Sequence, residues 1–287
     1  MFTAGPPGAP ARPARLVSAH ARVFAETSPT ALDPALRPFL ADLVRPYGNA
    51  LREDLLTEGV GHSFGEMAEA MLPAVVGPDE PVDLLVLAFA MHDLRLGRAT
   101  ACYLSDQCPG APMAFAVCDQ GSGAAFTALR LTESYLGSGA CERALVVVVE
   151  QSALHYEPGE PAPIPDRHTG VVLRLERTGS PVAVGQHTGV DAQRVTQLLR
   201  DDVARLGRRA TVVASARLAE AAPGVADVVA DAGQPYTGIW CELAGGGHEG
   251  MVLVADYEPS LGLLCTSTVD FSGNDHSAVD SAAVAVA

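Results

Sequence analysis

The chain has 287 residues, of which 48% are hydrophobic and 18% charged, with a mean hydropathy of +0.18. This is enough apolar material for one large α/β domain or for two fused halves. The 34 Asp and Glu residues outnumber the 19 basic residues, all of them arginine, and the formal net charge is -15. Because no broad basic face can form, we exclude nucleic acids and anionic membrane surfaces as partners.

The six cysteines, at positions 102, 108, 118, 141, 241 and 265, form no CxxC pair and have no zinc-type spacing. Several lie in apolar or Gly-rich stretches, which favours free thiols in a reducing cytoplasm. Met1–Arg15 lacks the hydrophobic run of a signal peptide, and no apolar stretch of about 18 residues occurs in the sequence. We therefore expect a cytoplasmic protein without a membrane span.

Hydrophobic periodicity predicts alternating strands and helices along the first half. Leu16–Phe24 alternates like a strand, and Val82–Ala90 is a near-continuous apolar run, typical of a buried parallel strand. Other expected elements are helices at 32–44, 63–76, 96–106 and 124–136, and strands at 113–118 and 144–150. Short glycine-marked turns between them indicate βαβ units with helices on both faces of the sheet.

After a Pro-rich loop at 157–165, the same kinds of element recur without a residue-level repeat. We expect strands at 171–175, 181–184, 211–214, 239–243 and 251–255, and helices at 192–206 and 216–221. The predicted organisation is a flexible tail at 1–15, a first half at 16–156, a shortened second half at 157–256, and an extension and tail at 257–287.

The window 82–151 carries a specific resemblance to a known family. It contains a buried strand, the segment FAVCDQGSGAAF, an apolar helix and the segment GACERALVVVVEQ. Asp166–Leu173 and the Gly-rich turn before Met251–Ala255 add looser matches. Over residues 16–255 the chain resembles β-ketoacyl-ACP synthase III and its relatives in the thiolase superfamily. The resemblance implies an α/β thiolase fold, with two similar βαβαβ-type halves in α-β-α-β-α layers.

In that family a Cys at a strand-to-helix turn is acylated, and a His and an Asn orient the extender thioester. The helix N-terminus stabilises the thiolate. Here the resemblance places Gly121 at the nucleophile position, Ser215 (or Ala214) at the His position and Gln234 at the Asn position. We therefore expect the Claisen condensation to be lost. No cofactor is expected, and the implied ligand is an acyl-CoA or acyl-ACP phosphopantetheine thioester.

Residues near these positions are candidates for a rewired site. Ser122 follows the lost nucleophile, but no His is close in sequence to activate its alcohol, so a packing residue or helix cap is the simpler interpretation. His248, in the terminal Gly-rich turn, is the other rewired candidate. Substrate-contact candidates in the acyl-entry region are Cys118, Asp119 and Gln120, although a strand Cys is more simply a core thiol. Asp119 is a second candidate cap for the following helix.

Histidines and arginines elsewhere suggest two further sites. The spacing of His155, His168 and His248 gives no support to a metal site, and we expect none. An arginine cluster on and after the predicted helix at 192–206 is the candidate docking site for an acidic acyl carrier protein: Arg200, Arg205, Arg208 and Arg209. The interleaved acidic residues favour a solvated helix face with i,i+4 pairs instead.

The leading hypothesis is a ketosynthase-like subunit without catalysis of its own, in polyketide or fatty-acyl-derived secondary metabolism. It would pair with an active ketosynthase-like subunit, as the chain-length factor of type II polyketide systems does, or with a copy of itself. The alternatives are an acyltransferase or cyclase with a rewired site, or a stand-alone acyl-binding module. An α/β hydrolase is weaker, because G-x-S-x-G around Ser122 requires Gly at position 120, which is Gln.

Overall fold

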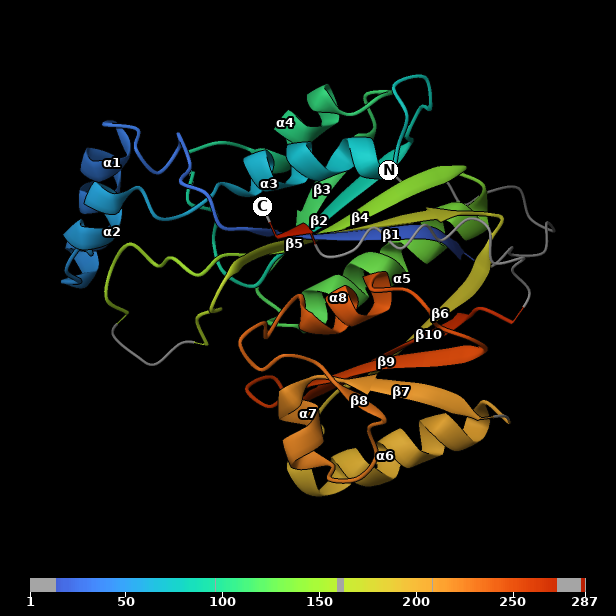
Figure 1. Ribbon diagram of the computed structural model, residues 1–287. Coiled ribbons are helices and arrows are strands. Elements are labelled where there is room, and N and C mark those ends of the chain that lie inside the picture. Colours follow the sequence, from blue (N-terminus) through green and yellow to red (C-terminus); the bar gives the residue numbers. More distant parts are fainter. Residues whose placement is uncertain (1–13, 96, 159–162, 208, 273–284, 287) are drawn as a thin grey trace.

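Two similar halves make up the molecule (Figure 1). The computed structural model describes residues 14–272, except 96, 159–162 and 208, together with 285–286. The first half contains strands β1 (Arg15–Phe24), β2 (Leu84–Ala88), β3 (Met113–Val117), β4 (Arg143–Glu150) and β5 (His168–Glu176). The second half contains β6 (Ser180–His187), β7 (Ala210–Ala214), β8 (Val228–Val229), β9 (Met251–Glu258) and β10 (Leu263–Asp270).

The strands of the two halves follow the same pattern. The first half has the order β3-β2-β4-β5-β1, in which β3, β2 and β4 are parallel and β5 is antiparallel to both neighbours. The second half has the order β8-β7-β9-β10-β6, with the same alternation of directions. The halves join where β1 pairs with β6, and β11 (Ala285–Val286) pairs with the other end of β1.

Helices form three layers around the strands (Figure 1). The outer face of the first half is covered by α3 (Phe64–Met71), with η2 (Leu72–Ala74) after it, and by α4 (Thr100–Gln107). The outer face of the second half is covered by α6 (Ala192–Arg205) and α7 (Ala216–Ala221). Between the sheets lie α5 (Gly123–Ser138) and α8 (Gly238–Ala244). The expected α-β-α-β-α architecture is thereby confirmed.

Local sequence signals account for several of these elements. Strand β4 is apolar along almost its whole length because helices cover both of its faces. Helix α3 begins at a capping box, in which Ser63 and Glu66 satisfy each other's backbone amides. Helix α5 ends at Gly139, whose φ of +79° is one that glycine adopts readily. On one side of the first half project α1 (Leu36–Val44), η1 (Arg45–Tyr47) and α2 (Glu53–Glu58) (Figure 1).

The strand predicted at 239–243 is wrong, because these residues form helix α8. The short apolar run fits either structure. Its buried side chains are spaced as on one helical face: Ile239, Trp240, Leu243 and Ala244. The boundary drawn at residue 256 falls within β9, and β10 extends the sheet into the segment assigned to an extension. Of the predicted tails, residues 1–13, 273–284 and 287 lie outside the described residues, while Arg15 already belongs to β1.

All six cysteines are free thiols in the structure. Within the described residues, no helix is long and apolar enough to cross a membrane.

Candidate functional site

Gly121 lies in the turn between β3 and α5, where the sequence resemblance places the nucleophile. Its φ is +51°, and the neighbouring Asp119 has a φ of +60°, so the turn uses left-handed backbone twice. The turn is closed by amide-to-carbonyl bonds from Gly123 to Gln120, at 2.9 Å, and from Ala124 to Gly121, at 3.3 Å. The position is therefore presented at the amino end of α5, between the two sheets.

Glu258 fills the space that a side chain at position 121 would need. A Cβ built on Gly121 would lie 2.4 Å from Glu258 Oε2 and 2.8 Å from its carboxyl carbon. Ser260 Oγ donates to Glu258 Oε1 at 2.7 Å, and Arg217 Nη1 donates to Oε2 at 2.9 Å. Because the carboxylate is held from both sides, a side chain at 121 could enter only by breaking these contacts.

Arg217 joins Glu258 to a second carboxylate, that of Asp256. Asp256 and Glu258 are two residues apart on β9 and therefore face the same side of the strand. Arg217 Nη2 lies 3.6 Å from Asp256 Oδ2 and also donates to the carbonyl of Pro235 at 3.2 Å. Its guanidinium lies 5.9 Å from the ring centre of Tyr236. One arginine thus contacts β9 and the loop that precedes α8.

Asp256 is 2% exposed and lies among polar groups that are incompletely hydrogen-bonded. Burial raises its pKa, and the Arg217 guanidinium and the hydroxyls of Ser122 and Ser215 act in the opposite direction. Neither oxygen of Asp256 makes a hydrogen bond of good geometry, nor do Ser122 Oγ and Arg217 Nε. The buried environment therefore favours the neutral form of Asp256 more than water does.

Ser215 and Gln234 have structural hydrogen bonds. Ser215 is the N-cap of α7, where its Oγ accepts from the amide of Leu218 at 3.2 Å. Gln234 Nε2 donates to Thr169 Oγ1 at 2.7 Å. Together with Arg217 the two residues line a cavity of about 20 Å³. This volume is enough for about one water molecule. We use "the centre" below for the region around Gly121, Ser215, Arg217 and Gln234.

Ser122 is buried at the N-cap position of α5, but its side chain makes no capping hydrogen bond, so the capping interpretation is wrong. Its side chain lies close enough to Asp256 to lower the pKa of that carboxyl group. A serine nucleophile needs a base that can reach solvent protons and substrate together. A fully buried aspartic acid with a raised pKa does not provide that at neutral pH.

His248 is held away from Ser122 by other partners. Its Nε2 bonds the carbonyl of Glu242 at 2.9 Å, and its ring stacks on Phe271 with 5.7 Å between ring centres. It lies in the Gly-rich turn after α8, as the sequence predicts, but none of its contacts in the described part of the chain involves Ser122.

The three predicted substrate-contact residues form separate local contacts. Cys118 Sγ donates to Asp119 Oδ2 at 3.4 Å, and burial, reinforced by that carboxylate, raises the pKa of the thiol. Gln120 Oε1 accepts from Thr127 Oγ1 at 2.6 Å, so Asp119 and Gln120 have partners other than the helix amides. Cys118 is thus disfavoured as a thiolate nucleophile.

His168 and Ser152 lie close together but cannot act as a base and nucleophile. The Ser152 amide donates to His168 Nδ1 at 3.2 Å, which leaves the ring proton on Nε2. Nε2 lies 3.3 Å from Ser152 Oγ and is therefore the donor. Burial lowers the pKa of His168 to about 4. His155 bonds the carbonyl of Val60, and no group of three or more His, Cys, Asp or Glu among the described residues is arranged to hold a metal.

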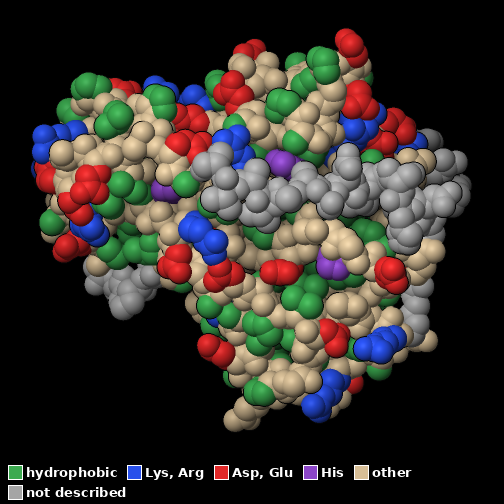
Figure 2. Space-filling view, in the orientation of Figure 1, with side chains coloured by type: hydrophobic (Ala, Val, Ile, Leu, Met, Phe, Trp, Pro, Cys, Tyr) green, Lys and Arg blue, Asp and Glu red, His purple; other side chains and the backbone are tan. Residues whose placement is uncertain are grey.

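The arginine cluster on α6 lies beside carboxylates. Arg205 pairs with Asp202, which also accepts from His187 at 2.9 Å, while Arg200 and Arg209 are exposed. Arg208 lies outside the described residues. Elsewhere, Figure 2 shows acidic and basic side chains interspersed over one face of the molecule. Docking of a carrier protein on this helix stays a prediction.

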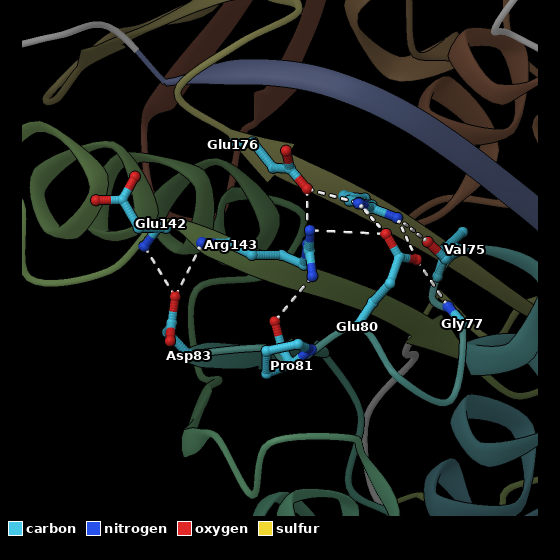
Figure 3. Close-up of polar contacts among 9 residues, drawn as sticks. Val75, Gly77, Glu80, Pro81, Asp83, Glu142, Arg143 and Glu176 are labelled. Atoms are coloured by element: carbon cyan, nitrogen blue, oxygen red, sulfur yellow. Dashed lines mark hydrogen bonds and ion pairs between the residues drawn. The ribbon is translucent and has the colours of Figure 1, made fainter.

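A larger cavity, of about 460 Å³, lies at the amino ends of β2 and β4, which is the end of the sheet opposite to the centre. Figure 3 shows the polar network beside it. Arg143 donates to Glu176 and to the carbonyl of Pro81, and Asp83 accepts from the amides of Glu142 and Arg143. Because these groups already bond one another, we assign the network a structural role.

Sequence reasoning missed Arg217, Asp256 and Glu258. The signal available was a pair of carboxylates on one face of a strongly buried strand, which requires a nearby cation or proton. The partner, Arg217, lies 41 residues before Glu258, so the sequence does not identify it.

No protein-family model matches the chain, and neither does any curated protein. Solved structures share its fold. The tetronic acid condensing enzyme AbyA1 is 17% identical with a TM-score of 0.62, the match covering 90% of this chain and 99% of that one. The 3-oxoacyl-(acyl carrier protein) synthase III from Pseudomonas aeruginosa is 15% identical with a TM-score of 0.62, and the match covers 90% of this chain and 98% of that one. The acyltransferase ChlB3 is 16% identical with a TM-score of 0.62, and the match covers 90% of this chain and 97% of that one. The chain thus has the thiolase-type fold of these condensing and acyl-transferring enzymes.

Proposed function

We propose that this chain is a ketosynthase III-like subunit that does not condense acyl groups itself and that pairs with an active condensing enzyme. The reaction of the pair would serve polyketide or fatty-acyl-derived secondary metabolism. The observation that carries the proposal is the Glu258 carboxylate beside Gly121, in the space of the missing nucleophile side chain.

The electrostatics of the turn support this proposal. In an active enzyme the amino end of the helix after the turn stabilises a thiolate and the charge that develops on the acyl group. Here that end faces the carboxyl groups of Asp256 and Glu258, with Arg217 between them. An added anionic intermediate would lie against an existing carboxylate, which disfavours its formation.

The outer edge of β3 is the surface that we propose for pairing. Strand β3 has the sequence MAFAV and is the first strand in the described sheet order, so its outer edge has no partner strand in the described chain. Met113 is 47% exposed there, and Ala116 is also exposed. An uncharged apolar edge of this kind favours pairing with another chain.

The test is co-expression with active ketosynthase III-type enzymes from the same source, followed by size-exclusion chromatography and an acyl-transfer assay on each species. We expect a heterodimer whose activity requires the Cys of the partner subunit and is unchanged by Ser122→Ala or His248→Ala in this chain. A homodimer that turns over an acyl thioester alone, and loses activity in either variant, would instead identify a rewired acyltransferase or cyclase.

A further inference from the structure

Arg217 contacts several segments that meet at the centre. It is the second residue of α7 and follows Ser215, which caps that helix. Its guanidinium pairs with Glu258 and Asp256 on β9 and donates to Pro235 in the loop before α8. Its side chain is 24% exposed, so it extends from the surface into the centre.

The space around Arg217 is nearly filled. The cavity that it lines with Ser215, Gln234 and Ile239 measures about 20 Å³. On the other side, Glu258 occupies the space beside Gly121. Glu258 depends on Arg217 for one of its two side-chain hydrogen bonds. Arg217 therefore both pairs with the buried carboxyl groups of Asp256 and Glu258 and fills space beside the turn that contains Gly121.

We propose that Arg217 closes the centre and keeps small molecules from the amino end of α5. This inference rests on the proposed function and deepens it, because it names the side chain that keeps the inactive centre shut. Replacing Arg217 with a shorter side chain removes the guanidinium that pairs with Asp256 and Glu258. The space that it leaves would connect these two carboxyl groups to solvent. The opened site would accept a small planar cation such as guanidinium, because this ion can replace the lost donors to Glu258 and to the Pro235 carbonyl.

The test introduces a thiol as a reporter through Ser122→Cys and measures its alkylation by iodoacetamide, located by peptide mass spectrometry. In the otherwise wild-type chain we expect slow alkylation at position 122, because Ser122 is 4% exposed. Adding Arg217→Ala should raise the rate about ten-fold or more, since access then requires no local opening of the ion pairs. Low millimolar guanidinium should reverse part of this gain, whereas tetramethylammonium at the same concentration should not.

Internal controls separate opening of the centre from unfolding. Cys108 and Cys141 are buried elsewhere and should stay slow, while a variant that unfolds would alkylate them together with position 122. If Arg217→Ala does unfold, Arg217→Ala with Glu258→Gln removes the unpaired charge and is measured in the same way. The matched control is Arg200→Ala, an exposed arginine on α6.

Equal alkylation at position 122 with and without Arg217, in a folded variant, would overturn the proposal. This outcome would leave the proposed function untouched, because the heterodimer assay does not depend on access to Ser122. Conversely, turnover by this chain alone would refute the proposed function whatever the alkylation rates.

Discussion

Two features of the structure require glycine at position 121: the backbone conformation and the lack of space for a side chain. Its φ of +51° favours glycine, and the Glu258 carboxylate stands where a Cβ would lie. The backbone conformation alone costs a non-glycine residue about 1–2 kcal/mol. Displacing Glu258 from Arg217 and Ser260 adds a second cost, since a half-broken buried ion pair is destabilising.

We predict that Gly121→Ala lowers the free energy of unfolding by about 2–4 kcal/mol, because both costs apply. The matched control is Gly189→Ala, where φ is +65° and no atom lies within 4 Å of the added Cβ. That variant should lose only the conformational cost, about 1–2 kcal/mol. Urea unfolding of the two variants checks the difference. Equal losses would show that Glu258 yields freely and does not exclude a side chain at 121.

At the scale of elements, patterns within one segment predict most of the fold. The run at 144–150 and the helix after the β3 turn are long enough for their periodicity to identify them. Helix α8 was assigned as a strand because its short apolar run, flanked by glycines, has no unique period. Strand β10 was missed because the family resemblance ends before it. In the centre, the resemblance predicts three replaced positions, and this stays a prediction. The Arg217 ion pairs depend on tertiary contacts, which the sequence does not give.

The network in Figure 3 shows what joins the elements of the first half at the end opposite the centre. Arg174 on β5 donates to Glu80 at 3.0 Å, to Glu176 at 2.7 Å and to the carbonyl of Val75 at 2.9 Å. Glu176 also accepts from Arg143 at the start of β4. The loop before β2 is thereby tied to two strands through charged hydrogen bonds in a half-buried setting.

We predict that Arg174→Met lowers the free energy of unfolding by about 2–3 kcal/mol. The variant keeps the apolar stem, but it removes one of the two arginine donors to Glu176 and the donor to the Val75 carbonyl. The control is Arg37→Met, whose pair with Glu53 is more than half exposed on both sides. Exposed pairs of this kind contribute about 0–1 kcal/mol. Thermal and urea unfolding measure both, and a cost for Arg174→Met no larger than the control would contradict the role assigned to the network.

At the scale of the whole molecule, charge and pairing have to be considered together. The net charge of -15 disfavours direct docking of an acidic carrier protein, so in the proposed pair the carrier would dock on the other subunit. Stability also depends on charge through two buried groups with opposite effects. Burial lowers the pKa of His168 to about 4 and raises that of Glu150 to about 7. Glu150 accepts from the amides of Tyr236 and Thr237, so it joins the halves.

These shifts predict how stability depends on pH. In the unfolded chain His168 takes up a proton near its ordinary pKa of 6.5, whereas in the folded chain it does so only near pH 4. Its contribution to stability is therefore present above pH 6.5 and is lost as the pH falls from 6.5 toward 4. Glu150 holds its proton in the folded state up to about pH 7, so its contribution is present at low pH and is lost as the pH rises from 4.5 toward 7. The contributions of His168 and Glu150 therefore oppose each other between pH 4.5 and 6.5.

Replacing His168 should remove its contribution to the pH dependence of stability and leave the opposing contribution of Glu150 in place. Relative to wild type, His168→Asn should gain stability steadily as the pH falls from 6.5 toward 4, by roughly 3 kcal/mol in total. Ser152→Ala is the matched control, because it removes a hydrogen-bond partner of His168 while leaving the buried ring in place, and it should keep the wild-type trend. Urea unfolding at a series of pH values between 4 and 7 gives both differences. A pH-independent difference between His168→Asn and wild type would mean that this histidine is protonated equally in both states, and that acid sensitivity arises elsewhere in the molecule.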